Sequence, residues 1–202
     1  ALTFGMSAGI MAAVKQNSWV DYLSMGVAVI GISIPLFVIA PVLQLFFAMK
    51  HKWLPTSGWY TTGEGWKSVI LPAVSLSFAY FADIARLTRS SMLETLRSDY
   101  IRTAKAKGMK SSSIIFKHAM KGAMLPVVSY LGPAFAGIIT GSIVVEQIFR
   151  VPGLGKFFVQ SSFNRDYTLI VGVVIVYSVI LIFMNFIVDL VYAQLDPRIT
   201  YK

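Results

Sequence analysis

Long apolar stretches separated by short polar segments organise this chain of 202 residues. Four of them, at 23–49, 68–85, 123–145 and 167–193, hold at most one charged residue each. An α-helix rises 1.5 Å per residue and needs about 20 apolar residues to cross the hydrocarbon core of a bilayer. We therefore predict helical spans at about 23–49, 68–90, 123–147 and 167–193. The fold class is all-α, a polytopic transmembrane helical bundle in a single domain over 1–202.

A fifth apolar stretch lies at 1–14 and is too short to cross a bilayer by itself. It lacks an initiator Met and has no basic segment before its apolar residues, unlike a signal peptide. We expect it to be a partial span, the end of a helix whose beginning precedes this sequence.

Basic residues are concentrated in one segment, which predicts how the spans are oriented. The chain carries 18 Lys and Arg against 9 Asp and Glu, a net charge of +9. Half of these cations lie between residues 86 and 121, from the end of the second span to the start of the third: Arg86, Arg89, Arg97, Arg102, Lys105, Lys107, Lys110, Lys117 and Lys121. Because basic loops are retained on the cytoplasmic side, we expect this segment to be cytoplasmic and the loops near 50–67 and 148–166 to be outside. The positive charge then reflects membrane topology, and nucleic acid is not an expected partner.

The segment over 91–121 is too long for a simple turn and has a helical pattern. Leu93, Leu96, Tyr100 and Ala104 fall on one face of a helix, and Gly108 suits the end of that helix. The serines at 111–113 can cap a second short helix over 114–120. The pattern predicts helix, glycine turn, helix with an apolar face available to a partner, although a solvated basic loop lying on anionic lipid is the alternative.

Several runs in the sequence resemble ABC importer permeases of the dipeptide and oligopeptide family. The residues at 99–108, followed by those at 117–120 and 125–126, are similar to the cytoplasmic loop of that family. Further similarity lies at 145–149, 152–155, 164–167, 189–193 and 196–199. Within the family, the run at 129–135 resembles the B-type subunit of oligopeptide permeases.

The resemblance implies a type I permease fold with a cytoplasmic coupling helix, which docks in a groove of an ATPase subunit. The coupling residues it indicates are Tyr100, Arg102, Thr103, Ala104, Lys107, Gly108 and His118. At the Glu-Ala-Ala positions of the general importer consensus this chain has Arg102, Thr103 and Ala104. The resemblance therefore implies the docking role and specifies no particular polar contact.

The same resemblance implies a function and a set of partners. We expect a pore-forming subunit of an ATP-driven oligopeptide importer in the bacterial cytoplasmic (inner) membrane. Its partners would be a second homologous permease, two cytoplasmic ATPase subunits and an extracytoplasmic peptide-binding protein. ATP and Mg²⁺ would be bound by the ATPase subunits, and this chain would bind no cofactor or metal.

The sequence offers no catalytic constellation, so we do not expect this chain to be an enzyme. Gly155-Lys156 is followed by Phe157 and does not complete a phosphate-binding loop. His51 and His118 are isolated and lack the spacing of a zinc site. With no cysteine in the chain, disulfides and thiolate metal sites are excluded.

Charged residues in or near spans are functional candidates because they are costly in hydrocarbon. Asp83 and Arg86 are three residues apart, which favours a local ion pair. At the expected outer surface, Glu146, Asn164, Arg165 and Asp166 are candidates for the translocation path or an outer gate, and interfacial anchors are the alternative.

Three other functions remain open at this stage. A self-sufficient secondary transporter or channel would account for the spans, but it would leave the patterned basic segment without a role. A membrane-embedded hydrolase would need catalytic residues that the sequence does not present. An ABC permease for another cargo, such as dipeptides, nickel or heme, would share the motifs used above.

Overall fold

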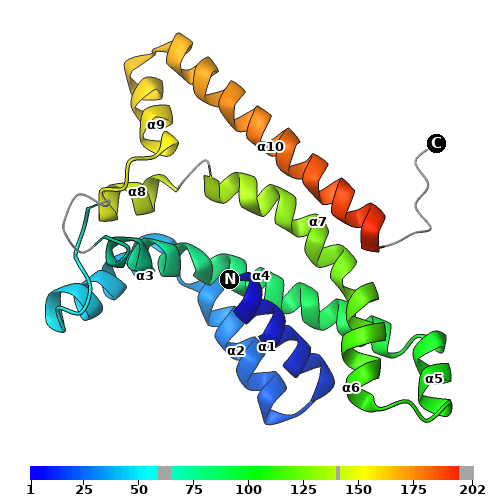
Figure 1. The fold of residues 1–202 in the computed structure, drawn as a ribbon. Coiled ribbons are helices and arrows are strands. Elements are labelled where there is room, and N and C mark those ends of the chain that lie inside the picture. Colours follow the sequence, from blue (N-terminus) through cyan, green and yellow to red (C-terminus); the bar gives the residue numbers. More distant parts are fainter. Residues whose placement is uncertain (59–64, 140–141, 196–202) are drawn as a thin grey trace. The chain divides into compact units, whose positions relative to one another are not determined.

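The structure, a computed structural model, describes residues 1–58, 65–139 and 142–195 (Figure 1). Within these ranges every regular element is a helix, which confirms the all-α prediction. Three helices are long and apolar enough to cross a membrane: Lys67–Leu96, Ser111–Ile139 and Tyr167–Ala193. The run over 196–199 noted above lies outside the described residues.

The predicted span over 23–49 is broken into two helices, α2 (Trp19–Ser33) and α3 (Leu36–Leu43), the second continuing into the π-helix η1 (Gln44–Lys50). The break has a local cause. Pro35 disfavours helical dihedrals at Ile34, so the first helix ends at Ser33 and the second begins after the proline. The helices on the two sides of the break are together still long and apolar enough for one interrupted membrane span.

The third predicted span is also shifted along the chain. The short helix α6 (Ser111–Ser113), the π-helix η2 (Ile114–Ala119) and α7 (Met120–Ile139) follow one another directly. They form one helical stretch that begins before the predicted position 123 and ends before 147. The second short helix expected at 114–120 is therefore the first part of this span, and α8 (Ile143–Phe149) is a separate helix.

The contacts of the chain divide it into two compact units. The first comprises Ala1–Gly31, Ala79–Pro133 and Met184–Lys202. The second comprises Ile32–Phe78 and Ala134–Phe183. The long helices α4 (Lys67–Leu96), α7 and α10 (Tyr167–Leu195) contribute to both units.

In the first unit, α1 (Leu2–Val14) packs closely on the second half of α4 through glycines. A Cβ atom at Gly9 would lie 2.6 Å from the Ala85 carbonyl oxygen and from Thr88 Cβ. The small side chains of Ala28, Ala82 and Ala85 are buried together beside this contact. Small residues let membrane helices approach one another closely, so α1, α2 and α4 form a tight three-helix assembly in this unit.

Polar side chains join α7 to the last part of α10 in the same unit. The Tyr192 hydroxyl donates to the Leu125 carbonyl at 3.0 Å and also bonds with the Ser129 hydroxyl. One turn further along α7, a Cβ at Gly132 would lie 2.6 Å from Asn185 Oδ1. Hydrogen bonds between helices stabilise packing in a bilayer, where apolar surface alone gives little preference.

The second unit has its own apolar core. The buried side chains of Ala40, Ala48, Leu71, Val145 and Phe149 come from α3, η1, α4 and α8. The helix α9 (Leu154–Asn164) follows α8 after a short turn. This unit holds the predicted outer-gate residues, and the first holds the basic segment.

Candidate functional site

The basic segment folds as a helix, a glycine turn and a second helix, as predicted. The helix α4 runs to Leu96, and α5 (Asp99–Ala106) begins after Ser98. The end of α5 is fixed by Gly108, which has a φ of +72°, in the left-handed region where a side chain would be strained. The Gly108 N–H donates to the Lys105 carbonyl and the Met109 N–H to the Ala104 carbonyl, the bonding pattern of a Schellman motif.

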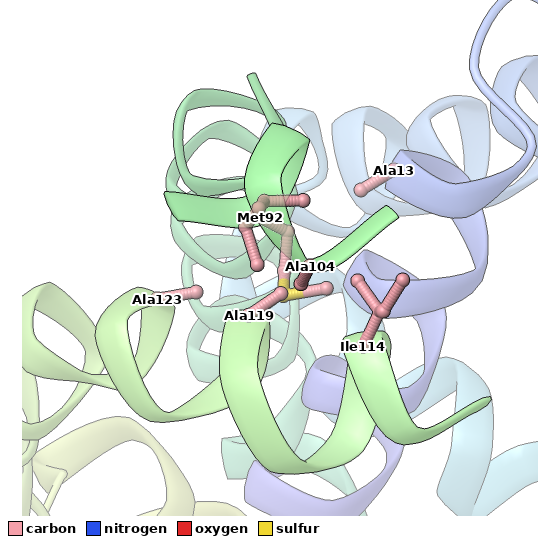
Figure 2. Close-up of a cluster of buried hydrophobic side chains, with 7 residues drawn as sticks. Ala13, Met92, Ala104, Ile114, Ala119 and Ala123 are labelled. Atoms are coloured by element: carbon pink, nitrogen blue, oxygen red, sulfur yellow. The ribbon is translucent and has the colours of Figure 1, made fainter. Parts of the chain in front are cut away.

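The apolar face of α5 packs inside the chain. Ile101 and Ala104 are buried in a cluster with Met92 of α4 and Ile114 of η2. The other members are Ala13, Ala119 and Ala123. Figure 2 shows the labelled side chains of this cluster pointing toward one another from α1, α4, α5 and the helix that begins at Ser111.

This packing corrects the expectation that the apolar face of the segment is available to a partner. Arg97 and Ser98 also interrupt the helix, so Leu93 and Leu96 belong to α4 while Tyr100 and Ala104 belong to α5. The internal cluster occupies the apolar side because burying it against the neighbouring helices removes it from water. A partner would therefore meet the opposite side of α5.

That opposite side is basic and exposed. We call it the basic face and define it by Arg102, Thr103, Lys105 and Lys107, all exposed to solvent. Arg102 forms an ion pair with Asp99 at 3.3 Å, but both side chains remain mostly in water. The face carries three cations on or directly after one short helix, an arrangement that suits an acidic surface.

The predicted coupling residues lie close together around α5 but differ in exposure. Ala104 is buried in the cluster, and His118 is half-buried in η2. Tyr100 is half exposed, and its hydroxyl lies 3.1 Å from where a Cβ of Gly122 would be. Beside them, Val14, Leu96, Lys105, Ser111, Ile114 and Ile115 line a pocket of about 250 Å³.

An ion pair that sequence reasoning missed ties the first turn of α2 to α4. Arg89 donates from Nε and Nη2 to the two carboxylate oxygens of Asp21, at 2.6 and 2.7 Å. Asp21 also accepts the Asn17 N–H at 3.0 Å, and its side chain is only 3% exposed. Directly after α4, Arg97 donates to Gln16 Oε1 at 3.3 Å. The only sequence signal was a carboxylate at the edge of an apolar stretch, with no indication of a partner 68 residues away.

Glu146, a predicted gate residue, is buried and supports the start of α9. Its carboxylate accepts the N–H groups of Gly155 and Lys156 at 3.3 and 2.8 Å. These are among the first N–H groups of the helix, which have no partner within it. A Cβ at Gly153 would overlap the carboxylate, so the glycine allows this close approach. Glu146, on α8, therefore caps the N-terminus of α9.

The other predicted gate residues lie at the far end of α9, about 16 Å away along an 11-residue helix. Arg165 ends α9 with a φ of +56° and is exposed, as is Asn164. Asp166 caps α10 by accepting the Leu169 N–H at 3.0 Å. The structure thus divides the four residues between two places, and their role as a gate stays a prediction.

The described helices define a multi-pass membrane protein. Residues 5–201 match the family described as "Binding-protein-dependent transport system inner membrane component", and the chain belongs to this family. Membership confirms the resemblance stated from the sequence motifs and the inner-membrane localisation.

Several curated proteins are similar over the whole chain. The oligopeptide transport system permease protein OppB of Salmonella typhimurium is 52% identical over 201 residues, covering 100% of this chain and 65% of that protein. The dipeptide transport system permease protein DppB of Bacillus subtilis is 49% identical over 199 residues, covering 98% of this chain and 63% of that protein. The glutathione transport system permease protein GsiC of Escherichia coli is 44% identical over 202 residues, covering 100% and 65%. The chain therefore spans about 65% of the length of the curated relatives that it matches.

Proposed function

We propose that this chain is a pore-forming subunit of an ATP-driven importer for oligopeptides. The relatives named above for oligopeptide, dipeptide and glutathione transport support peptide-like cargo, and the first of them supports oligopeptides in particular. In this proposal an extracytoplasmic binding protein delivers the peptide, and a second permease completes the pore. Two ATPase subunits on the cytoplasmic side bind ATP and Mg²⁺.

The observation that carries the mechanism is the way α5 is held. Its buried side, Ile101 and Ala104, joins it to α1, α4 and η2 in one cluster. Protein interiors are close-packed, so a displacement of α5 is transmitted to the helices that share its core. The basic face would receive the ATPase, and the cluster would pass the movement to the spanning helices.

The exposed positive charge on α5 also supports the proposed orientation of the chain in the membrane, with the basic segment in the cytoplasm. With nine cations between Arg86 and Lys121, the positive-inside rule places this segment in the cytoplasm, where the ATPase subunits would be. The turn between α9 and α10 then lies on the outer side, where a binding protein would deliver peptide.

Cysteine crosslinking tests the docking role, and the sequence of 202 residues contains no cysteine that would compete with an introduced one. A cysteine at Lys107 or Lys110 should crosslink to an ATPase subunit of the assembled transporter, with a yield that changes between the nucleotide-free and ATP-bound states. Asn164, exposed at the end of α9, is the matched control and should give no crosslink. An active assembly without any crosslink at positions 107 and 110 would contradict the coupling assignment.

The competing function, a self-sufficient transporter or channel, predicts a different result. Peptide uptake into proteoliposomes would continue after every ATPase subunit is removed. Under the proposed function, uptake stops in their absence and resumes when the ATPase subunits and ATP are restored. Measuring uptake of an oligopeptide, a dipeptide and glutathione with the same assembly then distinguishes among the peptide-like cargoes.

A further inference from the structure

A polar stripe follows one side of α4 in the first unit. It consists of the polar residues Asp83, Arg86 and Ser90 together with the small residue Ala79, spaced at i, i+4, i+7 and i+11, so that all four lie on one face of the helix. The side chains of Arg86 and Asp83 are 50% and 36% exposed. Ala79 and Ser90 are exposed as well.

The opposite side of the same helix is packed against the chain. Ala85, Thr88 and Met92 are fully buried there. The polar stripe is therefore the more exposed side of α4 in this unit, although Tyr130 of α7 contacts it at Asp83. Charged groups are costly in hydrocarbon and normally face a protein interior or water-filled space. A partly exposed ion pair on a spanning helix thus points to an aqueous environment.

The two charged groups are held in place but retain binding capacity. Arg86 Nη2 donates to Asp83 Oδ1 at 2.7 Å, and the Tyr130 hydroxyl of α7 donates to Asp83 Oδ2 at 2.8 Å. A carboxylate has about four acceptor sites and a guanidinium has five N–H donors. The bonds named here use two of the acceptor sites and one of the donors. An incoming cation or anion can therefore bind without breaking these bonds.

We propose that the polar stripe lines the peptide path and that Asp83 and Arg86 bind the charged termini of the peptide as it passes. This inference rests on the proposed function. The ammonium of a free N-terminus matches Asp83, and the carboxylate of a free C-terminus matches Arg86. The occupant is selected by charge complementarity: the site offers one anion and one cation, side by side and exposed. Tyr130 positions the Asp83 carboxylate from the neighbouring helix.

Cysteine accessibility in the assembled transporter tests the path. Cysteines at Ala79 and Ser90 should react with a charged, water-soluble thiol reagent, because only a thiol in contact with water forms the reactive thiolate. Pentaalanine with free termini should slow the reaction. Two control positions should not react: Ala85, which is buried on the other side of α4, and Ile182, an exposed apolar residue of α10.

A peptide with blocked termini is the control for recognition of the charged peptide termini. Pentaalanine with an acetylated N-terminus and an amidated C-terminus should protect neither cysteine. With Asp83→Asn or Arg86→Gln, free pentaalanine should need about tenfold higher concentration to protect Ser90→Cys, as expected for a lost hydrogen bond to a charged group. Asp189→Asn removes a carboxylate from another spanning helix and should leave protection unchanged.

The outcomes separate this inference from the proposed function. If the Ser90→Cys assembly imports peptide with ATP but is not labelled, the stripe faces lipid and the inference is wrong while the function stands. Labelling that appears only when the second permease is absent would assign the stripe to the permease interface and would also overturn the inference. Equal protection by free and blocked pentaalanine would remove the role of Asp83 and Arg86. An assembly that never imports peptide would contradict the function itself.

Discussion

Replacing Asp21 with asparagine leaves Arg89 as a partly buried cation without its counter-charge. In the native protein the Asp21 carboxylate is almost fully buried and accepts two bonds from Arg89 and one from the Asn17 N–H. Removing one partner of a buried ion pair costs about 3–5 kcal/mol. Because the Arg89 side chain is still 27% exposed, water can solvate it in part, and we expect the lower end, about 3 kcal/mol.

Thermal unfolding of the purified assembly measures this loss. For a chain of about this size, 1 kcal/mol shifts Tm by about 2–4 °C, so Asp21→Asn should lower the Tm by about 6–12 °C. The exposed pair Asp99–Arg102 is the matched control. Exposed pairs contribute about 0–1 kcal/mol, so Asp99→Asn should shift Tm by about 4 °C at most.

A double variant separates the effect of the ion pair on stability from the effects of the individual side chains. Asp21→Leu combined with Arg89→Met removes both charges and leaves apolar groups of similar volume, a replacement that is often neutral or stabilising for buried pairs. It should therefore recover most of the loss seen with Asp21→Asn. An Asp21→Asn assembly with an unchanged Tm, or a double variant less stable than the single one, would refute the reasoning.

Three further substitutions test other contacts. Gly9→Leu should separate α1 from α4 and lower the Tm of the assembly by several degrees, whereas Gly26→Leu, where a Cβ meets nothing within 4 Å, should not; equal shifts would contradict the packing. Glu146→Ala removes the cap of α9 and should cost about 1–2 kcal/mol in the same measurement, with faster hydrogen exchange at the Lys156 amide, and unchanged exchange there would exclude the cap. Gly108→Ala forces a side chain into the left-handed region at a cost of about 1–2 kcal/mol. Relative to the native protein, its fractional loss of peptide uptake per ATP hydrolysed should be larger than its fractional decrease in Tm.

The sequence pattern predicted those parts of the fold that depend only on residues close together along the chain. The largely apolar stretch at 167–193 became α10, and Gly108 became the end of α5 because left-handed dihedrals favour glycine. The ion pair of Asp83 with Arg86 was also predictable, since residues three apart on a helix are neighbours.

Other features depend on which surfaces meet in three dimensions. The apolar side of α5 was visible in the sequence, but whether it faced a partner or the chain itself was decided by Met92, Ala13 and Ile114, which are distant in sequence or on another helix. The pairing of Asp21 with Arg89 likewise arises only when α1 and α2 pack on α4. The helix break after Ser33 was not predicted, although its cause, Pro35, is local. A search for continuous apolar stretches does not treat a proline as an interruption.

The helix α10 is mostly apolar, and none of its most apolar window is buried by the rest of the described chain. Such a helix can enter a bilayer by itself, but lipid gives it no reason to prefer one rotation about its axis over another. Asn185 and Tyr192, seven residues apart and therefore on one face, are the polar side chains that contact α7. Insertion and orientation of α10 are thus separate properties: its apolar length keeps it in the membrane, and these two side chains set which way it faces.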